Sequence, residues 1–252
     1  MFDSSRLQLA ANLAQASPDG WPESPLQQDG VHEFYAATEQ DGGAALALAL
    51  LCAVQARKAR EPLLWLRLGK VNGKGGGKQA RSRPYAPGLA ELGIDPAAMV
   101  LLRLPDLQSL LRAGVDSVRH GGAAAVVMEM DGRAPAFDLT ASRRLALAAE
   151  QSGTMVMIVR SGAQPTPSAA HTRWQVTSAP SVPLPANAPG DPVFDVTLLR
   201  RRGGREGLNL QLEWNREQGT FRKPMLGHAP LSGGHLSLPA VRTGDAGRRS
   251  AA

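Results

Sequence analysis

The sequence predicts an α/β fold: a mostly parallel, doubly wound sheet that antiparallel strands extend toward the C-terminus. Two observations predict it. Between residues 31 and 160, short apolar segments of strand length alternate with segments of helical periodicity, the pattern of a parallel sheet covered by helices on both faces. From residue 171 onward, apolar and polar residues alternate, as they do in half-buried antiparallel strands. The 252 residues are enough for one such domain with terminal segments beside it.

The chain is expected to divide into three parts. Residues 1–30 hold a short helix, expected over residues 4–15, and a linker rich in Pro, Gly and Gln. Residues 31–215 form the core domain. Residues 216–252 contain Gly, Pro, Ser and Arg without periodicity, so they are expected to be disordered. Both terminal parts carry apolar residues that are candidates for partner binding: Leu7, Leu13, Phe221 and Leu226.

Apolar patterns predict the elements of the core one by one. Compact apolar runs predict five buried strands, at residues 31–36, 63–68, 99–104, 123–130 and 154–160. Helical spacing predicts three helices, at residues 44–57, at residues 107–118, and from residue 138 or 140 to residue 151. Alternating segments predict three further strands, at residues 171–177, 194–202 and 208–214, the last two joined by a Gly-rich turn.

The basic residues behind the net charge of +6 are concentrated in one segment. Residues 57–83 carry nine basic residues and one acidic residue, whereas residues 1–50 carry seven acidic residues and one Arg. Residues 69–83 include a Gly- and Lys-rich run with nothing to pack, so a flexible loop is expected there. Its bases are candidates for contacts with the phosphates of single-stranded DNA: Lys70, Lys74, Lys78, Arg81 and Arg83. A loop that only keeps the protein soluble is the alternative.

The loop between the first predicted strand and helix lies where a phosphate-binding loop would lie. Such a loop needs Gly-rich backbone N–H groups, a Lys for the outer phosphates and a Ser or Thr for magnesium. Residues 36–45 read Ala-Ala-Thr-Glu-Gln-Asp-Gly-Gly-Ala-Ala: the Lys and its neighbouring hydroxyl are absent, and Glu39 would repel a triphosphate, as would Asp41. We therefore interpret Asp41, Gly42 and Gly43 as a degenerate site, with no cofactor expected and ATP binding as the alternative.

Other candidate chemistry is sparse. Glu129 ends the fourth predicted strand, where a magnesium-organising acid would lie; the alternative is a polar residue that merely ends a buried strand. No acid follows strand 63–68 to position water, and the sequence contains no Gly-x-Ser-x-Gly elbow and no Cys/His metal spacing. No catalytic residue, no metal site and no enzymatic activity are therefore expected.

Cysteine usage and hydropathy predict the compartment. The single cysteine, Cys52, lies in an apolar run and is interpreted as a small buried hydrophobe, so no intrachain disulfide is expected. The N-terminus shows no signal-peptide pattern, and the longest uncharged apolar run, residues 42–54, is too short to span a bilayer. A cytoplasmic location without membrane contact is expected.

Several segments resemble the core of the RecA recombinase, in the same order along the chain. Residues 85–95 (Tyr-Ala-Pro-Gly-Leu-Ala-Glu-Leu-Gly-Ile-Asp), followed by the apolar residues 100–102, resemble the segment that leads into its third core strand. Residues 122–130 resemble its Walker B strand. Residues 168–176 and the hairpin over residues 196–214 resemble its closing strands. The resemblance covers roughly residues 30–215 and implies a RecA-like core.

Three segments are closer still to the ImuA family: residues 85–96, residues 138–145 (Asp-Leu-Thr-Ala-Ser-Arg-Arg-Leu) running on to Gly153 and Thr154, and residues 167–174 (Pro-Ser-Ala-Ala-His-Thr-Arg-Trp). This resemblance implies a non-catalytic accessory or scaffold role in damage-induced, error-prone translesion DNA synthesis, part of the SOS response. It implies two partners, an ImuB-like relative of the Y-family polymerases and an error-prone polymerase III alpha-type subunit. RecA and single-stranded DNA are further candidate partners.

Two alternative functions stay open at the level of the sequence. A SulA-like SOS cell-division inhibitor is one, because residues 62–130 also resemble that family; SulA proteins are markedly shorter, and the extra predicted strands over residues 171–214 favour ImuA. A DNA-dependent RecA-like ATPase is the other. The predicted fold favours that activity, and the degenerate loop opposes it.

Overall fold

A nine-stranded sheet organises the protein. The computed structural model describes residues 26, 30–56, 61–72, 78–80, 83–204 and 206–224. The strands lie in the order β11-β10-β9-β8-β1-β7-β6-β2-β5. Their bounds are β1 Gly30–Ala36, β2 Leu63–Leu68, β5 Met99–Leu104, β6 Ala125–Asp131, β7 Met155–Ser161, β8 Thr172–Ala179, β9 Val193–Arg201, β10 Asn209–Asn215 and β11 Thr220–Arg222. From β8 to β5 all neighbours are parallel, and β9, β10 and β11 join antiparallel, which confirms the predicted fold class.

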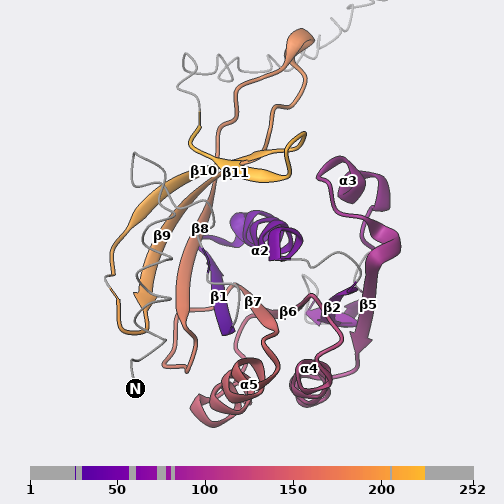
Figure 1. Cartoon of the computed structure of the whole chain (residues 1–252), viewed down its shortest axis with the longest axis vertical. Helices are drawn as coiled ribbons and strands as arrows, with labels where there is room; N and C mark the ends of the chain where they lie inside the picture. The colour runs from indigo at the N-terminus through magenta and orange to yellow at the C-terminus, as the bar shows by residue number, and fades with distance from the viewer. Residues whose placement is uncertain are drawn as a thin grey trace, which may run out of the picture.

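Helices cover both faces of this sheet (Figure 1). Helix α2 (Gly42–Ala56) lies on one face, and α4 (Leu107–His120) and α5 (Leu139–Ser152) lie on the other. The short helix α3 (Ala86–Glu91), which the sequence patterns do not predict, precedes the edge strand β5. Each face has its own apolar core, so the central parallel strands are buried on both sides, as their continuous apolar runs predict.

The two helices on the second face begin and end where their sequences provide caps. The side chain of Asp106 accepts the backbone N–H three residues later at 2.7 Å, and that of Asp138 does the same at 2.8 Å. Such an N-cap stabilises a helix by about 1 kcal/mol. The helices end at Gly121 and Gly153, whose φ of 68° is the left-handed conformation that glycine adopts without a steric penalty.

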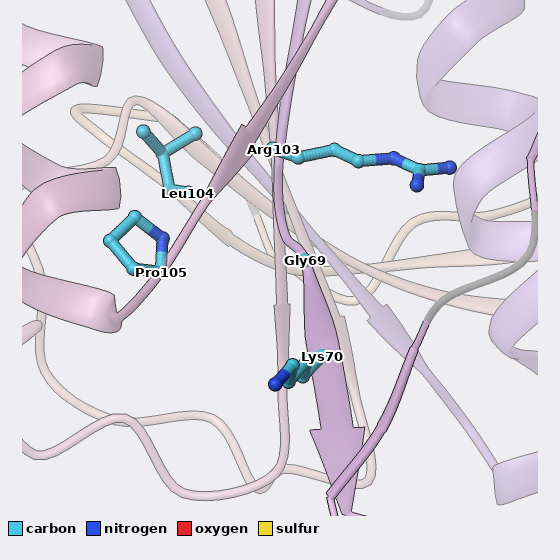
Figure 2. Close-up of a pocket in the computed structure, with 5 residues that line it drawn as sticks. All are labelled: Gly69, Lys70, Arg103, Leu104 and Pro105. Carbon is cyan, nitrogen blue, oxygen red and sulfur yellow. The ribbon is translucent and has the colours of Figure 1, made fainter.

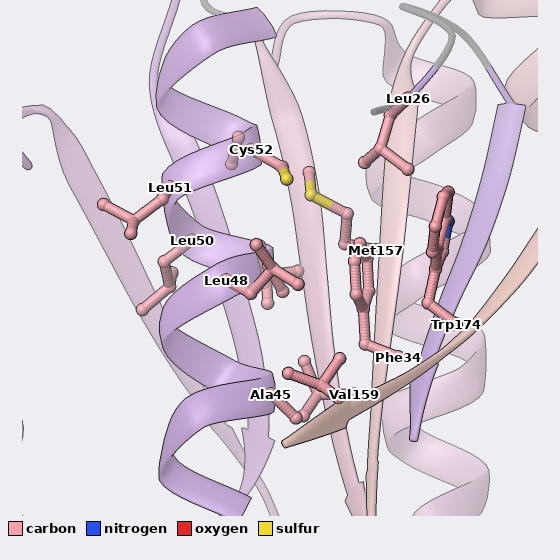
Figure 3. Close-up of a cluster of buried hydrophobic side chains, with 14 of the residues drawn as sticks. Leu26, Phe34, Ala45, Leu48, Leu50, Leu51, Cys52, Met157, Val159 and Trp174 are labelled. Carbon is pink, nitrogen blue, oxygen red and sulfur yellow. The ribbon is translucent and has the colours of Figure 1, made fainter. Parts of the chain in front are cut away.

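Helix α2 is buried on several sides, as its uncharged sequence predicts. Figure 3 shows Leu48 and Cys52 facing Phe34 and Met157 of the sheet, while Leu51 on the other side of the helix is buried as well. Burial raises the pKa of the Cys52 thiol, so the thiol stays protonated. This confirms the interpretation of that residue as a small hydrophobe.

The C-terminal strands complete the core on the α2 face. Trp214 of β10 and Phe221 of β11 pack edge to face with ring centroids 4.9 Å apart. The Trp214 indole N–H also donates a hydrogen bond of 3.0 Å to the Leu92 carbonyl, just after α3. The predicted end of the core at residue 215 is therefore wrong: the folded domain extends through β11, because a three-residue strand without periodicity of its own is stabilised by pairing with β10.

The basic segment 69–83 also contains regular structure. Strands β3 (Lys70–Asn72) and β4 (Lys78–Ala80) pair antiparallel as a separate two-stranded ribbon. The expectation of a loop without pairing partners is wrong here, because a hairpin forms its own backbone ladder even where its side chains have nothing to pack. Residues 73–77 and 81–82, the helix predicted over residues 4–15 and the segment after residue 224 lie outside the described residues. Within the described ranges, every helix is too short or too polar to span a lipid bilayer.

Candidate functional site

The loop predicted to be a degenerate phosphate site is closed by a carboxylate of its own. Asp41 ends a short 3-10 turn, Glu39–Asp41, between β1 and α2, and its side chain is buried. Its Oδ2 accepts hydrogen bonds from the Thr38 backbone N–H at 3.1 Å and the Thr38 hydroxyl at 2.7 Å. Its Oδ1 accepts the backbone N–H of Ser178 at 2.9 Å and the Ser178 hydroxyl at 3.0 Å.

These four hydrogen bonds determine the charge of the loop. They lower the pKa of Asp41 below its ordinary value, with the bond from the Thr38 hydroxyl as the largest cause and the Ser178 backbone N–H next. Asp41 is therefore an ionised, internal anion bound by two backbone N–H groups and two hydroxyls. Those donors are of the kind that would cradle a phosphate, and they are already engaged.

The two glycines after Asp41 leave little else in this loop that could recognise a ligand. A Cβ added at Gly42 would lie 3.0 Å from the Ser161 Oγ at the end of β7, so this glycine permits a close approach of α2 to the sheet. A Cβ added at Gly43 would meet nothing within 4 Å. Neither residue brings a positive charge to the start of α2. The loop residues described here therefore contribute an anion where a nucleotide site needs a cation.

Glu129, the candidate magnesium-organising acid, lies in a buried charge pair. Its Oε2 lies 3.2 Å from the Arg67 Nε and accepts the Trp65 indole N–H at 3.1 Å. The Arg67 guanidinium lies over the Trp65 ring, 5.0 Å from its centroid. Burial lowers the pKa of Arg67, and the charge of Arg103 adds to this, but a guanidinium stays protonated. A magnesium ion at Glu129 would compete with a buried, preformed cation.

Arg67 is a residue that pattern reading overlooked, although the register of the sheet explains it. Arg67 of β2 is directly opposite Glu129 of β6, so both side chains leave the same face of neighbouring parallel strands. A single charge near the end of each apolar strand was the available signal. It was interpretable only with the strand order, which local sequence does not contain. The described residues include no cluster of three or more His, Cys, Asp or Glu side chains placed to hold a metal ion.

A second buried ion pair, also absent from the sequence predictions, lies on the opposite face of the sheet. Glu33 of β1 accepts the Arg173 Nε–H of β8 at 2.9 Å, and the Tyr35 hydroxyl donates to the same carboxylate oxygen at 3.3 Å. Arg173 also donates to the Ser168 hydroxyl at 2.9 Å. Desolvation raises the pKa of Tyr35, and the nearby Glu33 charge adds to this. These contacts join β1 to the loop before β8, so we interpret them as structural.

A hollow of about 400 Å³ lies beside the base of the basic hairpin. Its lining comes from the ends of β2 and β5: Gly69, Lys70, Arg103, Leu104 and Pro105. Figure 2 shows the Arg103 guanidinium pointing away from the side on which Leu104 and Pro105 lie. The positive charges at this edge therefore do not converge on one point, and the hollow does not have the convergent polar groups of a small-molecule site.

The predicted DNA-contact residues are partly located. Lys70 and Arg83 are exposed, and Lys78 lies on β4 opposite Asn72 of β3. The structure thus places Lys70 and Lys78 on the two arms of one hairpin. Lys74 and Arg81 lie outside the described residues.

The predicted partner-binding residues fare differently. Phe221 is 5% exposed and packs on Trp214, so the prediction that it contacts a partner is wrong: it is a core residue. Leu7, Leu13 and Leu226 lie outside the described residues.

Comparison with known proteins finds relatives by sequence and weaker similarities by structure. No protein-family model matches the chain. A segment of 138 residues is 38% identical to Protein ImuA of two Caulobacter vibrioides strains, NA1000 / CB15N and ATCC 19089 / CIP 103742 / CB 15. The match covers 50% of this chain and 55% of each relative, so the chain spans about half the length of the curated relatives it matches.

Two solved structures share parts of the fold at low identity. The RadB recombinase structure superposes with a TM-score of 0.47 and 14% identity, covering 76% of this chain and 89% of that chain. The SulA structure from Pseudomonas aeruginosa superposes with a TM-score of 0.35 and 16% identity, covering 51% of this chain and 96% of that chain. The strand order and direction of the sheet, rather than these superpositions, establish the fold class.

Proposed function

The 38% identity to two ImuA proteins supports assignment of this chain to the ImuA family, and we propose from this premise that it acts in damage-inducible mutagenesis. Its role there is that of a non-catalytic accessory protein. It acts in the cytoplasm with an ImuB-like relative of the Y-family polymerases and an error-prone polymerase III alpha-type subunit during translesion DNA synthesis. RecA and single-stranded DNA are secondary partners of the same proposal.

The internal carboxylate of Asp41 carries the non-catalytic part of this proposal. A working phosphate loop offers free N–H groups and a Lys to a triphosphate, whereas here a buried anion takes two N–H groups and two hydroxyls. A nucleotide would have to displace this carboxylate and then lie beside its negative charge. Both steps oppose binding, and no Lys in the loop offsets them.

The buried pair at Glu129 supports the same conclusion. ATP hydrolysis in this class of fold needs an acid that organises magnesium and another that positions water. Glu129 is held by Arg67 and Trp65, and the segment after β2 continues with Gly69 and Lys70 rather than an acid. The core is thus retained as a rigid scaffold for docking, without hydrolysis.

Two measurements on the full chain test this function. In cells that lack the gene, expression of the chain should restore damage-induced mutation frequency, and Glu129→Gln should restore it equally if its fold is intact. The purified chain should hydrolyse no ATP, with or without single-stranded DNA. Failure to restore mutagenesis contradicts the role. Turnover of roughly 1 per second or faster that Glu129→Gln abolishes contradicts the non-catalytic assignment.

A further inference from the structure

The connection between β8 and β9 stands clear of the sheet. Figure 1 shows it projecting beyond β10 and β11 as two arms that meet at a short turn, η3 (Pro185–Asn187). Six consecutive residues of this connection, residues 182–187, are exposed. Two of them are large apolar side chains, Val182 at 45% exposure and Leu184 at 48%. The core already described does not use either side chain.

The sequence of this connection fixes its backbone. Residues 180–192 contain five prolines, and the residue before each proline is restricted to extended or polyproline conformations. Val182 and Leu184 both precede a proline, and Leu184 has φ −76° and ψ 171°. The segment Val-Pro-Leu-Pro over residues 182–185 is therefore held extended before it meets any partner.

The tip and the arms of the connection are ordered by contacts of their own. The Leu184 N–H donates to the Ala188 carbonyl at 2.9 Å, closing a turn in which Ala186 and Asn187 have φ of 60° and 57°. Non-glycine residues in this left-handed region are strained and persist where the surrounding chain enforces them. A Cβ added at Gly190 would lie 1.9 Å from the Val182 carbonyl oxygen, so only glycine allows the two arms to pack this closely.

Charged residues pin the base of the connection to the sheet. Asp191 accepts a hydrogen bond of 2.7 Å from Arg216 and lies 3.5 Å from Arg222, which also pairs with Glu213 at 3.1 Å. Arg216 donates a second hydrogen bond, of 3.4 Å, to the Pro189 carbonyl. The two arms are thus attached to β10 and β11, and the projecting segment is carried on a fixed base.

We propose that residues 182–185 bind in an apolar, aromatic-lined groove of the ImuB-like partner, with Val182 and Leu184 as the buried anchors. This inference rests on the proposed function and adds the contact surface to it. Extended Pro-rich segments bind such grooves because their conformation is formed in advance, so little ordering is lost on association. Burying the two exposed side chains supplies the hydrophobic driving force.

The test uses the purified full chain and the purified ImuB-like protein of the same organism, with affinity measured by calorimetry. The double variant Val182→Asp, Leu184→Asp should bind at least about tenfold more weakly. Leu208→Asp, which changes a side chain 44% exposed near the start of β10, serves as the matched control and should bind like the unchanged chain. All three proteins should share one thermal midpoint, because the changed side chains lie at the surface.

A second variant separates preorganisation from side-chain contact. Pro183→Ala combined with Pro185→Ala keeps both anchors and loosens the backbone, so it should weaken binding by a few-fold, less than the aspartate pair does. Equal binding by the aspartate variant and the unchanged chain overturns the assignment of this surface, while the proposed function stands. Absence of binding by the unchanged chain overturns the proposed partnership, and the assignment of its contact surface with it.

Discussion

Asp41 is the single residue on which the character of the phosphate loop depends most. Its carboxylate joins the turn after β1 to Ser178 near the end of β8, two segments that are 137 residues apart in the sequence. Hydrogen bonds to a charged acceptor are among the stronger ones in a protein, and their loss leaves buried donors unsatisfied. The residue that removes nucleotide chemistry therefore also stabilises the connection between the two strands.

We predict that Asp41→Asn lowers the free energy of unfolding by about 1–3 kcal/mol, because an amide nitrogen would face donors in place of one carboxylate oxygen. Urea denaturation at neutral pH measures the change. Asp116→Asn, which alters an exposed carboxylate on α4, is the control and should be neutral. A destabilisation no larger than that of Asp116→Asn would show that the four hydrogen bonds contribute no net stability.

The same carboxylate gives a dependence on pH with a definite sign. The folded pKa of Asp41 is lower than its ordinary value of 3.8, so the unfolded state binds the proton more readily. The stabilisation is complete above pH 3.8 and disappears as the pH falls from there through the folded pKa. In the Asp41→Asn variant this part of the acid-induced destabilisation should be missing from the stability curve.

At the scale of an element, the β3–β4 hairpin is the best candidate for contact with DNA. It carries Lys70 and Lys78 on opposite arms, and the exposed Arg83 follows it. A two-stranded ribbon without a core of its own can adjust to a nucleic-acid backbone while its charges stay together. Contacts of this kind recognise phosphates with little sequence preference and weaken strongly with salt.

Replacing the five predicted DNA-contact bases with Gln should weaken binding of single-stranded DNA. The slope of log affinity against log salt should become shallower by about 0.7 for each phosphate that the protein no longer neutralises. Fluorescence anisotropy of a labelled oligonucleotide at several salt concentrations measures both effects. The control replaces five exposed arginines elsewhere, with the same change in net charge: Arg112, Arg119, Arg133, Arg143 and Arg144. If both sets weaken binding equally, net charge rather than the hairpin is responsible.

At the scale of the whole molecule, the antiparallel extension is part of the fold rather than an addition to it. Trp214 and Phe221 belong to the same apolar core as Phe34 and Leu48, near the other end of the described chain. The core on the α2 face is therefore closed only when β10 and β11 are in place. Truncation at the boundary that the sequence predicts would remove β11.

We predict different outcomes for two truncations that differ by nine residues. A chain that ends at residue 224 should keep the thermal midpoint of the full chain. A chain that ends at residue 215 lacks Phe221, and its midpoint should fall by roughly 10 °C, from a destabilisation of about 3–5 kcal/mol. Scanning calorimetry measures both, and Phe221→Ala in the full chain should reproduce most of the decrease. Equal midpoints for the two truncations would place β11 outside the cooperative core.

The features that the sequence predicted correctly are those with a local cause. Apolar runs located the parallel strands, helical spacing located α4, and Asp138 with Gly153 marked the ends of α5. The missed features depend on pairing between distant segments. Strands β3, β4 and β11 have three residues each, which is too short for a periodicity, and Arg67 meets Glu129 only through the order of β2 and β6.

The candidate site divides along the same line. The missing Lys and the acidic residues of the phosphate loop could be read directly from residues 36–45. That Asp41 is bound by Ser178 could not, because the hydroxyl comes from a strand whose place beside β1 is a property of the whole sheet. Residues 182–185 gave no periodic signal, since proline restricts the backbone without producing an apolar pattern.

The hydrogen bond between Trp214 and the Leu92 carbonyl has a consequence for the birth of the chain on the ribosome. Its two ends are 122 residues apart, so at roughly 10 residues per second the carbonyl emerges about ten seconds before its donor exists. During that interval the α2 face of the nascent sheet lacks its last two strands and exposes apolar surface. A slow ribosome or a busy chaperone would therefore act on this protein through its unfinished face, well before the finished domain has any stability to lose.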